Sequence, residues 1–96
     1  MPTTGHLIKN GKIIDVPVSE LKVNDTVLVR PGEKIPSDGI VIEGESFVNE
    51  ALLTGESKPI HKEKGDEVIG GAINGEGMLK VKIERTGERN LSSASN

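Results

Sequence analysis

Turn-forming residues cut this chain into short apolar runs, and that punctuation limits the fold more than any other feature. Asn10-Gly11, Pro31-Gly32, Asp38-Gly39 and Gly75-Glu76-Gly77 interrupt segments rich in Ile, Val and Leu. Asn-Gly accepts the positive φ angles of a two-residue hairpin turn, and Pro-Gly or Asp-Gly closes a strand. Turns repeated about every eight to twelve residues predict an all-β fold, either a sandwich or jelly roll or a small barrel.

Individual strands follow from the same pattern. Residues 7–9 and 12–16 form the predicted hairpin, and residues 78–84 alternate apolar with charged side chains as a half-buried strand does. Residues 40–43 predict a strand that stops at Gly44, with a separate short strand at 46–49. We expect one helical turn capped by Ser19 in the connecting segment 18–25, one helical turn at 50–53, and an edge strand from Pro59.

Composition narrows the class of protein. The 96 residues suit one domain with an aliphatic core, because Phe47 is the only aromatic residue. A net charge of −3 and a single aromatic side chain disfavour nucleic-acid binding, and the absence of Cys excludes disulfides and thiolate metal sites. No apolar run approaches the ~18 residues of a membrane span, and residues 1–5 lack the features of a signal peptide. We therefore expect an isolated chain of this sequence to be soluble.

The candidate chemistry lies in the polar loop formed by Thr54, Gly55, Glu56 and Ser57. A carboxylate can take a proton from water and direct its oxygen at an electrophile, whereas spacing alone favours an ordinary exposed glutamate. No electrophile is evident in the chain, so such chemistry would act on a group supplied by another domain. We expect His6 and His61 to be ordinary residues rather than metal ligands, and Glu43, Glu45 and Glu50 to be solvated.

The loop and its surroundings resemble the actuator domain of P-type ATPases, membrane pumps that pass through an aspartyl-phosphate intermediate. The resemblance runs from about residue 18 to residue 87 and rests on an ordered series of motifs: Pro36-Ser37-Asp38-Gly39, Gly44-Glu45-Ser46, residues 49–59 around Thr54-Gly55-Glu56-Ser57, Lys64-Gly65-Asp66, Val68, and Gly71-Ala72-Ile73-Asn74. Such an ordered set is far more specific than a four-residue loop alone.

The resemblance implies a distorted jelly roll, similar to a double-stranded β-helix, over residues 1–87 with a core at about 7–85 and a polar tail or linker at 88–96. It also implies a role for each loop residue. Glu56 would position a water for attack on the aspartyl phosphate of a separate phosphorylation domain, and Gly55 would permit close approach. Thr54 and Ser57 would hydrogen-bond the phosphate or shape the loop.

Within the family the sequence is most similar to the heavy-metal branch, and Asn49, where Asp is usual, matches a copper-exporting subgroup. The implied partners are the phosphorylation and nucleotide-binding domains and the transmembrane helices of the same pump, on the cytoplasmic face of a membrane. ATP and Mg would serve the full-length enzyme, with no cofactor or metal in this domain. The isolated domain is expected to be monomeric and without hydrolytic activity.

Two other classes of protein fit the sequence less well. A lipoyl- or biotinyl-type carrier domain has a similar size but needs an exposed hairpin Lys beside Met, which Met78-Leu79-Lys80 imitates poorly. An oligonucleotide-binding barrel is disfavoured by the charge and by the single Phe.

Overall fold

The structure is a computed structural model that describes residues 4–56 and 58–85. Its regular secondary structure is almost entirely β-strand, which confirms the all-β prediction. The predicted tail at 88–96 lies outside the described residues. The strands are β1 (Thr4–Lys9), β2 (Lys12–Pro17), β3 (Thr26–Val29), β4 (Asp38–Asn49), β5 (Pro59–Glu63), β6 (Glu67–Val68), β7 (Ile73–Asn74) and β8 (Met78–Arg85), and the helical turns are η1 (Val18–Glu20) and α1 (Ala51–Thr54).

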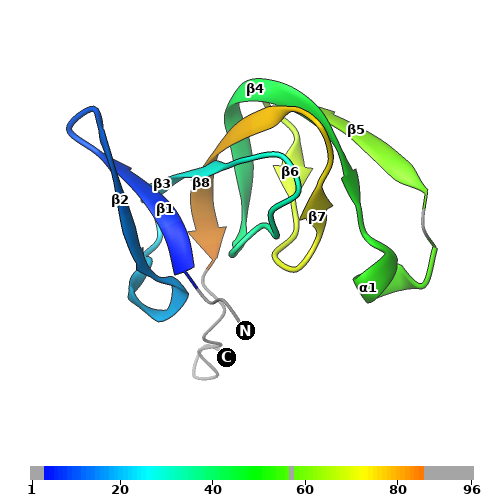
Figure 1. The fold of residues 1–96 in the computed structure, drawn as a ribbon, viewed down its shortest axis with the longest axis horizontal. Helices are drawn as coiled ribbons and strands as arrows, with labels where there is room; N and C mark the ends of the chain where they lie inside the picture. Colours follow the sequence, from blue (N-terminus) through cyan, green and yellow to red (C-terminus); the bar gives the residue numbers. More distant parts are fainter. Residues whose placement is uncertain (1–3, 57, 86–96) are drawn as a thin grey trace, which may run out of the picture.

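All the strands in the described residues belong to one antiparallel eight-stranded sheet, in the order β2-β1-β3-β8-β4-β5, with β6 and β7 also paired to β4. The long strands β4 and β8 curve over as an arch, with the β1–β2 hairpin at one side of the molecule and α1 at the other (Figure 1). None of the helices described is long and apolar enough to cross a membrane.

The core is aliphatic, as the composition predicts. Leu79, Val81 and Ile83 on β8 are each 0% exposed, while Lys82 and Glu84 between and beyond them face solvent. This confirms the half-buried alternating strand. Phe47, the one aromatic residue, is 53% exposed and takes no part in the core.

The predicted strand stop at Gly44 is wrong. β4 runs without interruption from Asp38 to Asn49, and Gly44 sits inside it at a φ of 98°. A register shift between Val41 and Glu43 adds a bulge where β4 pairs with β8. The glycine therefore bends a continuous strand rather than ending it, because β8 supplies pairing partners on both sides of the bend.

The hairpin prediction is confirmed, since Asn10 and Gly11 both have positive φ values, 55° and 78°, as a type I′ turn requires. The predicted cap at Ser19 is wrong. Ser19 lies inside a three-residue 3₁₀ turn whose N-cap is Pro17, and no side chain caps it. The fixed φ of proline starts the turn without a hydroxyl cap.

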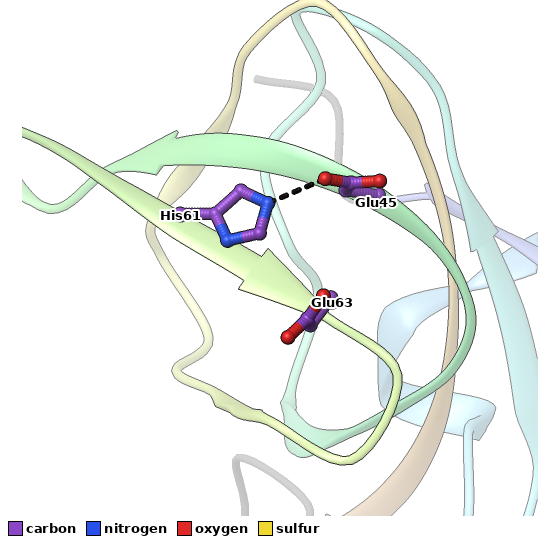
Figure 2. Close-up of side chains that lie close together, drawn as sticks. All are labelled: Glu45, His61 and Glu63. Atoms are coloured by element: carbon purple, nitrogen blue, oxygen red, sulfur yellow. Dashed lines mark hydrogen bonds and ion pairs between the residues drawn. The ribbon is translucent and has the colours of Figure 1, made fainter.

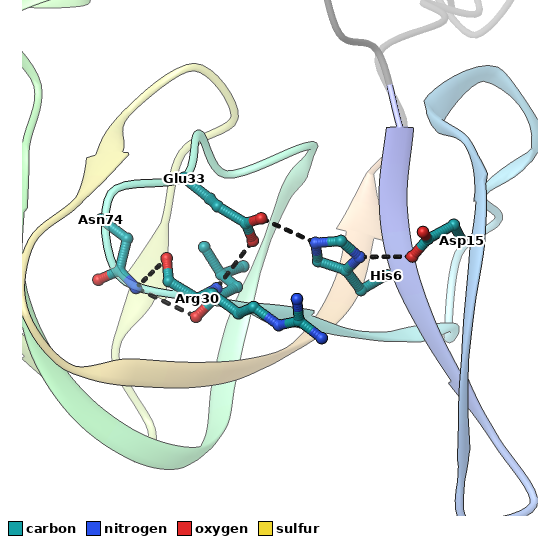
Figure 3. Close-up of polar contacts among 6 residues, drawn as sticks. His6, Asp15, Arg30, Glu33 and Asn74 are labelled. Atoms are coloured by element: carbon teal, nitrogen blue, oxygen red, sulfur yellow. Dashed lines mark hydrogen bonds and ion pairs between the residues drawn. The ribbon is translucent and has the colours of Figure 1, made fainter.

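His6 contacts two carboxylates, one within the β1–β2 hairpin and one on the β3–β4 connection (Figure 3). Its Nδ1 lies 2.7 Å from Asp15 Oδ1 on β2, and its Nε2 lies 2.8 Å from Glu33 Oε2 on the β3–β4 connection. Hydrogen bonds to Glu33 and Asp15 raise the pKa of His6 above its ordinary value. Burial by itself raises the pKa of Glu33, but the hydrogen bonds from His6 and from the Arg30 N–H outweigh it and leave that pKa lowered.

These shifts predict a pH-dependent stability. Because the folded state raises the pKa of His6, its contribution is complete below the unfolded value of about 6.5 and is lost as the pH rises through the folded value. The free energy of unfolding, measured with urea, should therefore decrease between about pH 6 and pH 8.5. The decrease should be about 1 kcal/mol larger in the parent chain than in His6→Gln. Glu33→Gln should show part of this flattening, because Asp15 still accepts a bond from the ring. Equal pH profiles for the parent chain and His6→Gln would contradict the assignment.

Candidate functional site

The polar loop connects two paired strands. β4 ends at Asn49 and β5 begins at Pro59, and these two residues are register partners. The segment between them therefore forms a loop that leaves and re-enters the sheet at the same point. α1 occupies the first part of it and lies at the side of the molecule away from the β1–β2 hairpin (Figure 1). The predicted single helical turn at 50–53 is thus confirmed, shifted by one residue.

Side-chain and backbone groups at the end of β4 hold the helical turn. The Asn49 side-chain oxygen accepts a hydrogen bond from the Ala51 N–H at 2.8 Å, and the Glu50 carbonyl accepts from the Leu53 and Thr54 N–H groups, each at 2.8 Å. An aspartate carboxylate can accept the same bond, so Asn49 keeps this local function without the charge. Glu50 is only 9% exposed, which corrects the expectation that it is solvated; Glu43 and Glu45 are exposed as expected.

Thr54 shapes the loop. Its hydroxyl donates to the Glu50 carbonyl at 3.1 Å and accepts from the Glu56 N–H at 3.2 Å. The hydroxyl therefore links the helical turn to the residue that follows Gly55, and its donor is already used inside the loop.

Gly55 turns the chain outward. It adopts a left-handed conformation, φ 83° and ψ −2°, and its N–H donates to the Ala51 carbonyl at 2.9 Å, which ends the helical turn. Apart from its two chain neighbours, no atom of the described residues lies within 4 Å of the place that a Cβ would occupy, so the backbone angle is what favours glycine here.

Glu56 stands exposed beyond this turn. Within residues 4–56 and 58–85, no hydrogen bond or ion pair ties its carboxylate to another side chain. The structure therefore brings Thr54, Gly55 and Glu56 together on one projecting loop with an unengaged carboxylate. Ser57, the fourth predicted residue, lies outside the described residues.

Leu53 seats the loop against the sheet. A Cβ placed on Gly71 would come within 3.3 Å of Leu53 Cδ2, so the leucine lies over the backbone of the β6–β7 connection. Leu52, by contrast, is 70% exposed. The sequence analysis did not predict this contact.

A second group of polar residues was also missed. The structure brings Glu45, His61 and Glu63 together on β4 and β5, with His61 Nε2 2.7 Å from Glu45 Oε2. The residues are separated by up to 18 positions in the chain, and only the β4–β5 register places them side by side.

Comparison with known proteins gives a consistent picture. Residues 1–94 match the P-type ATPase actuator domain. The chain is 67% identical over 88 residues to copper-exporting P-type ATPase B of Archaeoglobus fulgidus, covering 92% of this chain and 13% of that protein. It is 47% identical to a probable copper-transporting P-type ATPase B of Staphylococcus aureus, covering 97% of this chain and 14% of that protein.

A solved structure has the same fold. It is a zinc-transporting PIB-type ATPase in its E2.Pi state, and it matches 90% of this chain with a TM-score of 0.83 and 28% sequence identity. The match covers 14% of that chain. This chain therefore spans about one seventh of the length of the proteins that it resembles.

Proposed function

Because the chain belongs to the actuator domains of the P-type ATPases, we propose that it serves a heavy-metal pump by dephosphorylating that pump's aspartyl phosphate. The observation that carries this proposal is the projecting loop, where Gly55 turns the chain into open space and Glu56 offers an unengaged carboxylate. A group that acts on another domain must be free to reach it, and among the described residues no side chain engages the Glu56 carboxylate.

In the proposed reaction, Glu56 accepts a hydrogen bond and then a proton from a water molecule aligned with the phosphorus atom. The water oxygen forms the new bond to phosphorus as the bond to the aspartate oxygen breaks, which releases inorganic phosphate and restores the aspartate carboxylate. Gly55 lets the loop backbone approach the phosphate closely, and Thr54 fixes the loop through its two hydrogen bonds. Ser57 is proposed to donate to a phosphate oxygen.

Movement of this domain is proposed to couple hydrolysis to transport. β1 and β8, the first and last described strands, lie on either side of β3 in the sheet. A rotation that carries the loop onto the phosphorylation domain would pull on transmembrane helices through both connections. The full-length pump would use ATP and Mg, and this domain would lie on its cytoplasmic face and be inactive and monomeric when isolated.

Copper is the proposed cargo, because the relatives of highest identity described above are named as copper pumps. The carrier-domain alternative gains no support. Lys80 lies within β8 and pairs with Glu43 at 3.1 Å, whereas a lipoyl- or biotinyl-type lysine must stand exposed on a hairpin.

A domain exchange tests the proposed function. Residues 1–96 should replace the matching segment of the Archaeoglobus fulgidus copper-exporting pump and retain metal-dependent ATP hydrolysis, because the two segments are 67% identical. A matched control pump with the segment replaced by a flexible linker should form phosphoenzyme without turning it over. A folded, membrane-inserted exchange pump that behaves like the linker control would contradict the proposal.

A further inference from the structure

One face of the β4–β5 ribbon gathers three potential metal ligands. Glu45 is the register partner of Glu63, and Phe47 is the partner of His61, so these four side chains share a face. One ligand atom each from Glu45, His61 and Glu63 lies within 4.8 Å of the others. Figure 2 shows the His61 ring beside the two carboxylates.

The two carboxylates on this face favour the binding of a cation. Two carboxylates placed directly opposite each other on paired strands repel. His61 Nε2 lies 2.7 Å from Glu45 Oε2, but in the described part of the chain no hydrogen bond or ion pair engages the Glu63 carboxylate. Lys80, on the neighbouring strand β8, is paired with Glu43 at 3.1 Å and so is already engaged.

The imidazole is held in place by its neighbour. The rings of Phe47 and His61 have centroids 5.2 Å apart and an interplanar angle of 56°. This contact limits the rotation of the His61 ring and keeps it beside the carboxylates. His61 and Glu63 are two positions apart on β5, and Glu45 lies opposite Glu63 on β4, so all three side chains project from the same side of the sheet.

We propose that Glu45, His61 and Glu63 form a surface site for a divalent transition-metal ion of the Zn²⁺ class. One imidazole nitrogen and two carboxylate oxygens match the donors that Zn²⁺ accepts at about 2.0 to 2.2 Å, with water as the fourth ligand. The Glu45 and Glu63 side chains are exposed and can rotate inward to reach such distances. Monovalent copper prefers sulfur ligands, so this site is distinct in chemistry from a Cu⁺ site.

Such an ion would stabilise the pairing of β4 and β5 beside the functional loop. Glu45 precedes the end of β4 at Asn49, and His61 and Glu63 follow the start of β5 at Pro59, so one metal would join the two strands from which the loop projects. Binding to the folded state alone stabilises that state by mass action. The proposed site requires only the folded chain, so its test does not depend on the pump function.

The test is a titration of the 96-residue chain with Zn²⁺, in which calorimetry measures the binding and NMR monitors the histidine ring signals. The chain has two histidines, so the ring signals report directly on which one binds. We expect saturation at one equivalent, with shifts in the His61 ring and none in the His6 ring. His61→Gln and Glu63→Gln should each weaken binding by about 10-fold or more. Glu20→Gln, which removes an exposed carboxylate on η1, should not change it.

Three outcomes would overturn the proposal. They are the absence of saturable binding, unchanged affinity in both His61→Gln and Glu63→Gln, and a response confined to His6. Circular dichroism of each variant shows whether it is folded, and Glu63→Gln keeps the proposal testable if His61→Gln fails to fold, because it replaces an exposed side chain with one of nearly equal size.

Discussion

Replacing Glu56 by Gln in a pump that carries this chain as its actuator should leave phosphoenzyme formation intact and slow its breakdown by about 10²- to 10⁴-fold. The amide keeps the size and hydrogen-bonding reach of the side chain but cannot accept a proton from water. The decay of labelled phosphoenzyme after a chase with unlabelled ATP measures this effect directly. Steady-state ATP hydrolysis should fall with it, because breakdown becomes the slow step.

Two companion variants separate chemistry from folding. Glu20→Gln removes an exposed carboxylate from η1, near the β1–β2 hairpin and away from the loop, and should decay at the parent rate. Glu56→Asp keeps the carboxylate on a shorter side chain, so it should recover part of the lost rate. Parent-like decay in Glu56→Gln would remove Glu56 from the proposed reaction.

Local patterns predicted the parts of the fold that depend on local chemistry. The positive φ values of Asn10 and Gly11 follow from an Asn-Gly turn, and the burial of Leu79 and Val81 follows from strict alternation. The structure also places an exposed turn at Thr54 to Glu56, where the polar residues predicted a loop, while their role in dephosphorylation stays a prediction.

The features that were missed depend on strand register. His6 meets Glu33 across 27 positions, and His61 meets Glu45 across 16, and neither separation carries a sequence signal. Gly44 was misassigned for a related reason. A glycine after a β-branched run predicts a stop when the run is considered alone, whereas its pairing with Leu79 on β8 continues the strand through the bend.

Gly44→Ala should destabilise the domain by about 3 to 5 kcal/mol, the largest stability effect we expect from one methyl group in this chain. Two costs combine. The φ of 98° is unfavourable for a residue with a Cβ, and the added Cβ would lie 2.2 Å from the Met78 carbonyl oxygen on β8. That oxygen belongs to the backbone of a paired strand, so it cannot move without breaking the β4–β8 pairing that the arch depends on.

Gly65→Ala is the matched control, because Gly65 has a φ of 95° but, apart from its chain neighbours, no atom in the described part of the chain within 4 Å of its Cβ position. Gly65→Ala should lower the free energy of unfolding by only about 1 to 2 kcal/mol, which is the cost of the unfavourable backbone conformation alone. In a domain of this size each kcal/mol lowers the melting temperature by about 4 to 8 °C, so thermal unfolding followed by circular dichroism should separate the two variants clearly. Equal melting temperatures would mean that β8 can yield at Met78, and the bend in β4 would then rest on backbone conformation rather than on the close contact between the two strands.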